Sequence, residues 1–153
     1  MLLSNFHEEK AKGKRGEKIV HPLLLSLGYE VEDVSEIREY RYKGDFIVNG
    51  LMIEVKNGER IGSTGRVLCE EEVYYKEEDR LCKGNMHCDS DIYVVVSEDT
   101  RKIYFFDFKV IKSLYKRLGD PIDIDHPQSI THARLLDLSF IRKYKGILGI
   151  AEY

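Results

Sequence analysis

The chain has 153 residues, of which 42% are hydrophobic and 33% are charged, a balance typical of a folded globular protein that excludes disordered and fibrous classes. No apolar run approaches the roughly 18 residues that a membrane-spanning helix requires, so no membrane partner is expected. The N-terminal residues do not have the pattern of a signal peptide, and three cysteines, an odd number, argue against a disulfide framework. We therefore expect a cytoplasmic protein with a single domain over residues 1–153.

The net charge of −3 does not by itself indicate a nucleic-acid partner, but the charges are unevenly distributed. Residues 70–79 are mostly acidic, whereas one basic group lies near the N-terminus and another lies at residues 109–117. Each group fits either a solvated surface or contacts with phosphates. The N-terminal basic group consists of Lys10, Lys12, Lys14, Arg15 and Lys18.

Residues 8–27 show a helical pattern, and Gly28 is suited to end this helix. Pro22 predicts a kink or a fresh helical start within it. Glu17 lies on the same stripe as the apolar Val20, one turn earlier. Its carboxylate either reaches solvent past the kink or points towards a polar site.

The next segment predicts a strand at residues 29–34 and then a β-hairpin over residues 42–57. Asn49-Gly50 is a strong type I′ turn signal, because both central residues of that turn need positive φ. The turn sets Phe46 opposite Ile53 and Asp45 opposite Glu54. The period of two then predicts one apolar face and, on the other face, a polar cluster. The apolar face consists of Phe46, Val48, Leu51, Ile53 and Val55, and the polar cluster of Asp45, Glu54 and Lys56.

The remainder of the chain predicts a mixed sheet flanked by helices, an α/β fold in the order α-β-β-β-(β)-β-β-α with a core at about 8–118 and a closing segment at 119–153. Residues 67–75 predict a strand or the start of a helix that continues to residue 81. Loops are expected at residues 57–66, 82–90 and 120–127. The other expected elements are a buried strand at 91–97, its partner at 103–108, a helix at 109–118 and a short strand or helix at 134–144.

Asp45, Glu54 and Lys56 form a group with reactive potential. Two carboxylates this close suit a hard cation such as Mg²⁺, and without a cation one of them would have to stay protonated. The lysine, two residues beyond Glu54 on the same strand, points the same way and can hold water and offset developing negative charge. This geometry suits the cleavage of phosphodiesters.

The spacing Asp45-x8-Glu54-Val55-Lys56 resembles that of the PD-(D/E)xK nuclease superfamily, which has a restriction-endonuclease-like α-β-β-β-α-β core. K-R-G-E, ending at Glu17, is similar to the first helix of that family, whose glutamate often completes the metal site. T-G-R-V-L-C-E, ending at Glu70, and S-D-I-Y-V-V-V at 90–96 are similar to later strands of one subset. Gly44 stands where the motif name has proline, and Arg66 replaces an asparagine.

The resemblance implies an endonuclease that depends on Mg²⁺ or Mn²⁺ and hydrolyses DNA. Asp45 and Glu54 would bind the metal, Lys56 would activate water, and Glu17 and Glu70 would complete the site. Two alternatives on the same scaffold are an inactive nucleic-acid-binding module and a Holliday-junction-type resolvase, which would be a homodimer. Candidate phosphate contacts are the N-terminal basic group with Arg38, Arg41 and Lys43.

Other interpretations remain open from the residues alone. The polar cluster fits a solvent-facing side of the hairpin in a protein-interaction domain. Cys69, Cys82, His87 and Cys88 are either reduced residues or zinc ligands, although their spacing fits no common zinc module. The acidic run at residues 120–126 fits a solvated loop or a Ca²⁺ site that lacks the glycine of an EF-hand.

Overall fold

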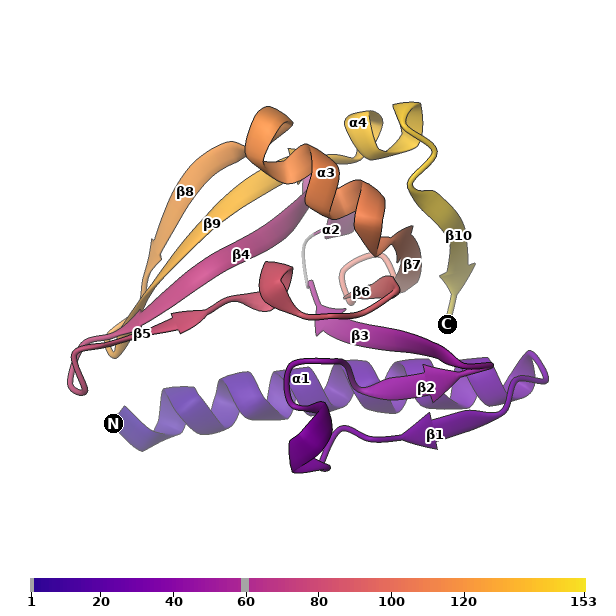
Figure 1. Ribbon diagram of the computed structural model, residues 1–153, viewed down its shortest axis with the longest axis horizontal. Coiled ribbons are helices and arrows are strands. Elements are labelled where there is room, and N and C mark those ends of the chain that lie inside the picture. Colours follow the sequence, from indigo (N-terminus) through magenta and orange to yellow (C-terminus); the bar gives the residue numbers. More distant parts are fainter. Residues whose placement is uncertain (1, 59–60) are drawn as a thin grey trace.

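The computed structural model describes the backbone of residues 2–58 and 61–153 and the side chains of residues 10–58 and 61–153. Two β-sheets organise it, here named sheet A and sheet B. A long helix covers one face of sheet A, while sheet B and a shorter helix lie over the other face (Figure 1). None of the described helices is both long enough and apolar enough to cross a membrane.

Sheet A has six strands in the order β1-β2-β3-β6-β7-β10. The pair β3–β6 is parallel and the other neighbours are antiparallel, so the sheet is mixed as predicted. The strands are β1 (Val31–Asp33), β2 (Phe46–Val48), β3 (Leu51–Asn57), β6 (Ile92–Ser97), β7 (Lys102–Asp107) and β10 (Ile147–Glu152).

Sheet B has four antiparallel strands in the order β5-β4-β9-β8. They are β4 (Arg66–Tyr75), β5 (Arg80–Lys83), β8 (Asp120–Asp125) and β9 (Ser129–Asp137). The helices are α1 (Leu2–Ser26), α2 (Ile61–Thr64), α3 (Phe108–Leu118) and α4 (Leu138–Lys143), with short 3₁₀ helices η1 (Arg38–Tyr40) and η2 (Asn85–His87).

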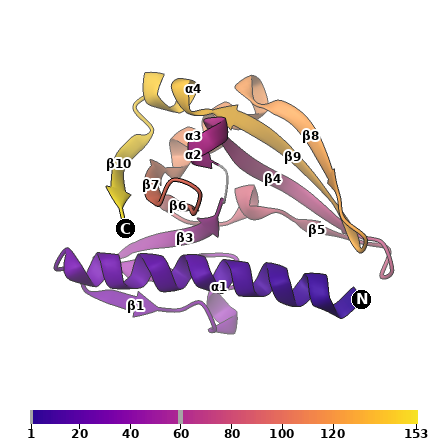
Figure 2. The same ribbon diagram turned by 180° about the vertical axis from the view of Figure 1, so that it is seen from behind.

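Helix α1 runs along sheet A, and its N-terminal end lies at the same end of the molecule as the turn between β4 and β5 (Figures 1 and 2). It begins earlier than predicted and continues through Pro22 as one helix, so the expected fresh start was wrong. The packing of Val20 and Leu24 against the sheet stabilises the helix and so offsets the loss of the hydrogen bond that proline cannot donate. The predicted end is confirmed, because Gly28 has a φ of 87° and its N–H donates to the Leu25 carbonyl at 3.0 Å.

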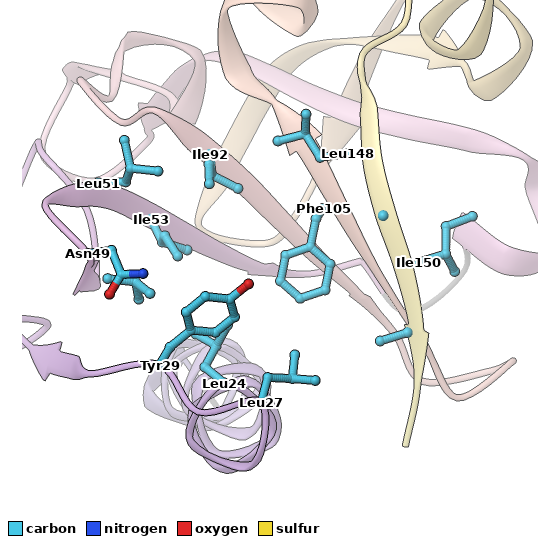
Figure 3. Close-up of a pocket in the computed structure, with 13 residues that line it drawn as sticks. Leu24, Leu27, Tyr29, Asn49, Leu51, Ile53, Ile92, Phe105, Leu148 and Ile150 are labelled. Atoms are coloured by element: carbon cyan, nitrogen blue, oxygen red, sulfur yellow. The ribbon is translucent and has the colours of Figure 1, made fainter.

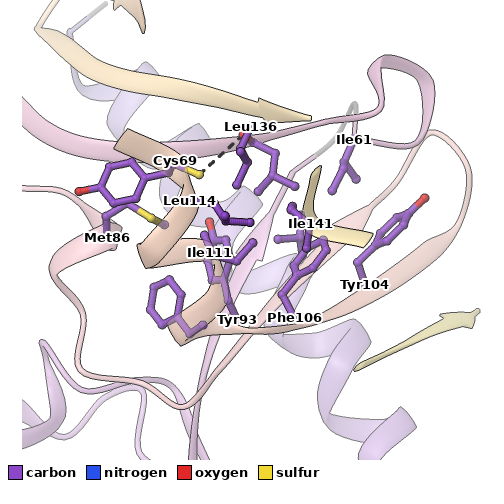
Figure 4. Close-up of a cluster of buried hydrophobic side chains, with 14 of the residues drawn as sticks. Ile61, Cys69, Met86, Tyr93, Tyr104, Phe106, Ile111, Leu114, Leu136 and Ile141 are labelled. Atoms are coloured by element: carbon purple, nitrogen blue, oxygen red, sulfur yellow. Dashed lines mark hydrogen bonds between the residues drawn. The ribbon is translucent and has the colours of Figure 1, made fainter. Parts of the chain in front are cut away.

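Two apolar clusters occupy the two faces of sheet A. On one face, the apolar stripe of α1 packs against strands β2, β3, β6 and β7, and this cluster includes Phe46 and Ile53. On the opposite face, Tyr93 and Phe106 pack against α3 and sheet B (Figure 4). Sheet A is therefore covered on both faces along its central strands.

The predicted hairpin is confirmed in its turn and in the register of the three pairs from Phe46–Ile53 to Val48–Leu51, whereas the predicted pair Asp45–Glu54 lies beyond the end of the ladder. Phe46 pairs with Ile53, and Asn49 and Gly50 have φ values of 50° and 79°. Leu51 is an exception to the predicted apolar face, because its side chain remains 45% exposed beyond the end of α1.

Several predictions after β3 need correction. The ambiguous segment from residue 67 is strand β4 followed by a turn and strand β5, and the expected loop at 57–66 contains α2. The acidic segment expected as a loop is strand β8, since Ile122 and Ile124 alternate with exposed aspartates and the strand pairs with β9. Residues 134–144 contain the end of β9 and then α4, and β10 was not predicted. The closing segment thus completes both sheets.

Candidate functional site

Asp45 lies where β2 diverges from β3. Its N–H donates to the Ile53 carbonyl at 2.8 Å, although Ile53 is the register partner of Phe46, so the regular pairing ends here. One residue pair further on, its Oδ2 accepts the N–H of Val55 at 2.8 Å, so the carboxylate replaces the β2 carbonyl that is missing there. Burial raises the pKa of Asp45 to about 7; this hydrogen bond opposes the shift and the charge of Glu17 adds to it.

Glu54 lies on the next strand, on the face of β3 opposite the core residues Ile53 and Val55. Burial raises the pKa of Glu54 to about 8, and repulsion from Asp45 is the second cause. The thiol of Cys88 donates to Glu54 Oε2 at 3.4 Å, and burial raises the pKa of this thiol to about 12, so it remains protonated. Lys14 lowers the pKa of Asp45 and Lys56 lowers that of Glu54, but burial outweighs both charges.

Lys56 connects the two sheets. Its Nζ lies 2.7 Å from Oε1 of Glu70 on β4, and the side chains are 34% and 17% exposed. Lys56, predicted to activate water, and Glu70, predicted to complete the site, therefore lie together. The positive charge of Lys56 also lowers the pKa of Glu54.

Glu17 approaches from α1. It accepts a hydrogen bond from Lys14 at 3.1 Å, and Lys14 also pairs with the exposed Glu36. Glu17 is close enough for its charge to raise the pKa values of both Asp45 and Glu54. Gly16 allows this approach, because a Cβ there would lie 3.3 Å from Asn57 Cβ on β3.

Residues 88–91, just before β6, hold both strands of the hairpin and were missed as site residues. The Cys88 thiol donates a hydrogen bond to Glu54, as described above. The hydroxyl of Ser90 donates to the carbonyl of Lys43, two residues before Asp45. Asp91 accepts the N–H of Met52 at 2.8 Å. These contacts fix the open end of the hairpin, and no spacing in the sequence indicates them.

A second missed contact positions Glu70. The N–H of Glu70 donates to Asn85 Oδ1 at 3.0 Å, and Asn85 donates to the hydroxyl of Tyr93 at 2.7 Å. A register shift in β4 follows at Glu70/Glu72, and such bulges redirect side chains beside active sites. Gly84 allows the close packing, because a Cβ there would lie 2.3 Å from the Glu70 carbonyl oxygen.

The acidic site residues do not form a set of metal ligands in this conformation. Among the residues that the structure describes, no three Asp, Glu, His or Cys side chains are close enough to hold a metal ion. The two outer acids, Glu17 and Glu70, are paired with lysines instead. Asp45 and Glu54 remain as a pair.

The two other candidate metal groups are dispersed. Cys69, Cys82 and Cys88 are free cysteines, with Cys69 in the core on β4 and Cys82 on β5. Two aspartates of β8 contact separate side chains: Asp123 hydrogen-bonds with His132 at 2.7 Å and Asp125 pairs with Lys76 at 2.6 Å. Zinc and calcium sites at these residues therefore gain no support from the geometry.

The predicted phosphate contacts are divided between α1 and the segment before β2. On α1, Lys10 and Lys18 are exposed, whereas Arg15 pairs with Glu98 at 3.1 Å. In the other segment, the exposed Arg41 and Lys43 lie over the rings of Tyr42 and Tyr40, respectively. Lys12 contributes its carbonyl to Asn57, and Lys14 is the partner of Glu17. Arg38 is exposed in η1.

Comparisons with known proteins identify no relative: no family model matches the chain, and neither curated proteins nor solved structures give a significant match.

Proposed function

We propose that this chain is a metal-dependent endonuclease of the PD-(D/E)xK type that hydrolyses DNA phosphodiester bonds. The observation that carries the proposal is the pair Asp45 and Glu54 at the open end of the hairpin, both partly buried and with raised pKa values, and close enough for the charge of Asp45 to raise the pKa of Glu54. The order α1-β1-β2-β3, followed by a strand parallel to β3, is also compatible with the restriction-endonuclease-like core. Between β3 and β6 this chain has mainly the strands β4 and β5, where that core has a helix.

The donor set fits a hard divalent cation. Two carboxylates held close together at low polarity repel each other, and a cation between them relieves both the repulsion and the cost of burial. Mg²⁺ and Mn²⁺ are bound by one or two carboxylates, with waters and substrate oxygens at the other positions. Asp45 and Glu54 would hold the ion, and Glu17 and Glu70 would interact with its waters from the outside.

When bound, the cation supplies Lewis-acid polarisation of a phosphoryl oxygen and of water. The protein residues would do the rest. Lys56, with its ammonium group at the edge of the carboxylate pair, would orient the attacking water and offset charge that develops on the phosphate. Glu70 would set the direction of that ammonium group. Exposed Lys18, Arg41 and Lys43 would contact neighbouring phosphates, a contribution that weakens as salt rises.

An inactive DNA-binding module is the second candidate. It is favoured by the pairing of Glu17 and Glu70 with lysines and by the lack of a three-ligand set among the described residues. Such a protein would bind DNA with a strong salt dependence and would not cleave it. A resolvase would cleave four-way junctions in preference to linear duplexes.

A cleavage assay distinguishes these functions. Labelled single-stranded, duplex and four-way-junction DNA would be incubated with Mg²⁺, Mn²⁺ or EDTA. We expect cleavage only with a divalent ion, and a loss of at least about 100-fold in Asp45→Asn and Lys56→Ala, the cost of removing one group that stabilises the transition state. Lys143→Ala, an exposed lysine on α4 outside both basic groups, is the control. Equal rates in all four proteins would refute the assigned roles.

A further inference from the structure

A recessed apolar surface lies at the end of the hairpin away from the charged site. It forms a pocket of about 460 Å³ where the end of α1 meets sheet A. Leu24, Leu27 and Tyr29 approach from the α1 side, facing Ile53 and Phe105 of the sheet (Figure 3). The described residues that line it include no charged side chain.

Large apolar side chains project around this pocket. We name as the apolar patch the pocket together with its five exposed side chains, which are 44–59% exposed. Side chains of this size and exposure present on the order of 400 Å² of apolar surface, the size of patch that in a monomer is often functional. The five are Leu27, Tyr29, Leu51, Leu148 and Ile150.

The adjoining edge of sheet A also differs from the other sheet edges. Among the described strands, β10 is outermost and pairs with β7 alone. The edge strands β1, β5 and β8 carry charged residues or proline, which discourage pairing with another chain. Strand β10 reads I-L-G-I-A-E, so its one charged residue, Glu152, is the last, and a Cβ added at Gly149 would meet nothing within 4 Å. The backbone beside the apolar patch is therefore open to approach.

We propose that the apolar patch is the contact surface between two copies of this chain. The net charge of −3 makes two copies repel over much of their surface, and an uncharged patch is where they can meet without that cost. In a two-fold contact the same patch is buried on both copies. The projecting Leu148 of one copy then enters the recess of the other.

The area is sufficient for such a dimer. Burial of the patch on both copies removes on the order of 800 Å², and the surrounding backbone and rim bring the total to roughly the 1,000 Å² that a specific interface needs. Contacts at this low end of the size range are weak, so the test must extend to high protein concentration. The charged site lies beyond Glu54, at the other end of β3, so both copies keep it accessible.

Sedimentation equilibrium of the full chain, up to about 100 μM, tests the proposal independently of any nuclease activity. The expected mass is twice the monomer mass of 17.8 kDa. Leu148→Asp should weaken the dimer at least about 30-fold, because both copies lose a buried leucine and gain a buried charge. Leu81→Asp on β5 is a matched control, since both leucines are 57% exposed and both changes add one negative charge.

Leu27→Asp, on a different element and also exposed, guards against a folding defect in β10, and circular dichroism checks that each variant is folded. A wild-type protein that stays monomeric over the whole concentration range overturns the proposal. So does a dimer that Leu148→Asp and Leu81→Asp weaken equally, because the contact would then lie elsewhere.

Discussion

The carboxylate pair should be visible in the pH dependence of stability. Asp45 ionises near pH 3.8 in the unfolded chain, whereas burial raises its pKa to about 7 in the folded protein. The folded state therefore binds this proton more tightly. The stability that the protonated group contributes is complete below pH 3.8 and is lost as the pH rises through 7.

The magnitude follows from the pKa shift. Each pKa unit corresponds to about 1.4 kcal/mol and Asp45 is half protonated at pH 7, so the free energy of unfolding should fall by about 2 kcal/mol between pH 5 and pH 7 because of Asp45 alone. Glu54 adds a loss of the same sign, since its pKa is raised to about 8. In Asp45→Asn the side chain no longer titrates, yet its amide oxygen can still accept the Val55 N–H.

Thermal unfolding in EDTA at pH 5 and pH 7.5 measures the effect. From pH 5 to pH 7.5, the difference in melting temperature between Asp45→Asn and the wild type should shift by about 4–8 °C in favour of the variant. Asp89→Asn is the control, because Asp89 is exposed and lies close to the site in residues 88–91. The reasoning fails if Asp45→Asn differs from the wild type by the same amount at both pH values.

Three further results are expected. Lys56→Ala should bind Mn²⁺ in calorimetry with nearly unchanged affinity while DNA cleavage is lost, and a parallel loss of both would show that the lysine serves the metal site rather than the water. Cys88→Ala should weaken Mn²⁺ binding about tenfold by removing a hydrogen bond to a ligand, and Cys88→Ser should restore it; equal affinities in the two variants would count against that bond. Gly84→Ala should lower the free energy of unfolding in urea by about 1–3 kcal/mol, because its Cβ meets a β4 carbonyl at 2.3 Å. Gly13→Ala, where nothing lies within 4 Å, should not destabilise α1, and similar losses in both glycine variants would contradict the packing argument.

The hairpin was predictable because its information is local. Asn49-Gly50 specifies the turn, and the alternation of apolar residues specifies the register as far as Phe46 and Ile53, the residues next to Asp45 and Glu54. The end of α1 was predictable for the same reason, since Gly28 adopts the conformation that glycine favours there. Helix α3 likewise carries its apolar spacing and its N-cap, Asp107, within one short segment.

The contacts that complete the site depend on long-range packing and were not predictable. Lys56 reaches Glu70 across two sheets, and Cys88 reaches Glu54 from a loop 34 residues later. The exposed positions of strand β8 are three aspartates and a proline, residues that favour loops, and its two isoleucines were too few to outweigh them. Strand β10 gave no signal because Gly149 and Ala151 weaken its apolar alternation.

A crystal of the protein grown with Mn²⁺ and measured at the manganese absorption edge tests the central proposal most directly. The account predicts an anomalous peak bound by the carboxylates of Asp45 and Glu54, with Glu17 or Glu70 turned from its lysine towards the waters of the ion. A peak at other residues, or a site that stays empty at millimolar Mn²⁺ and pH 8, would contradict it.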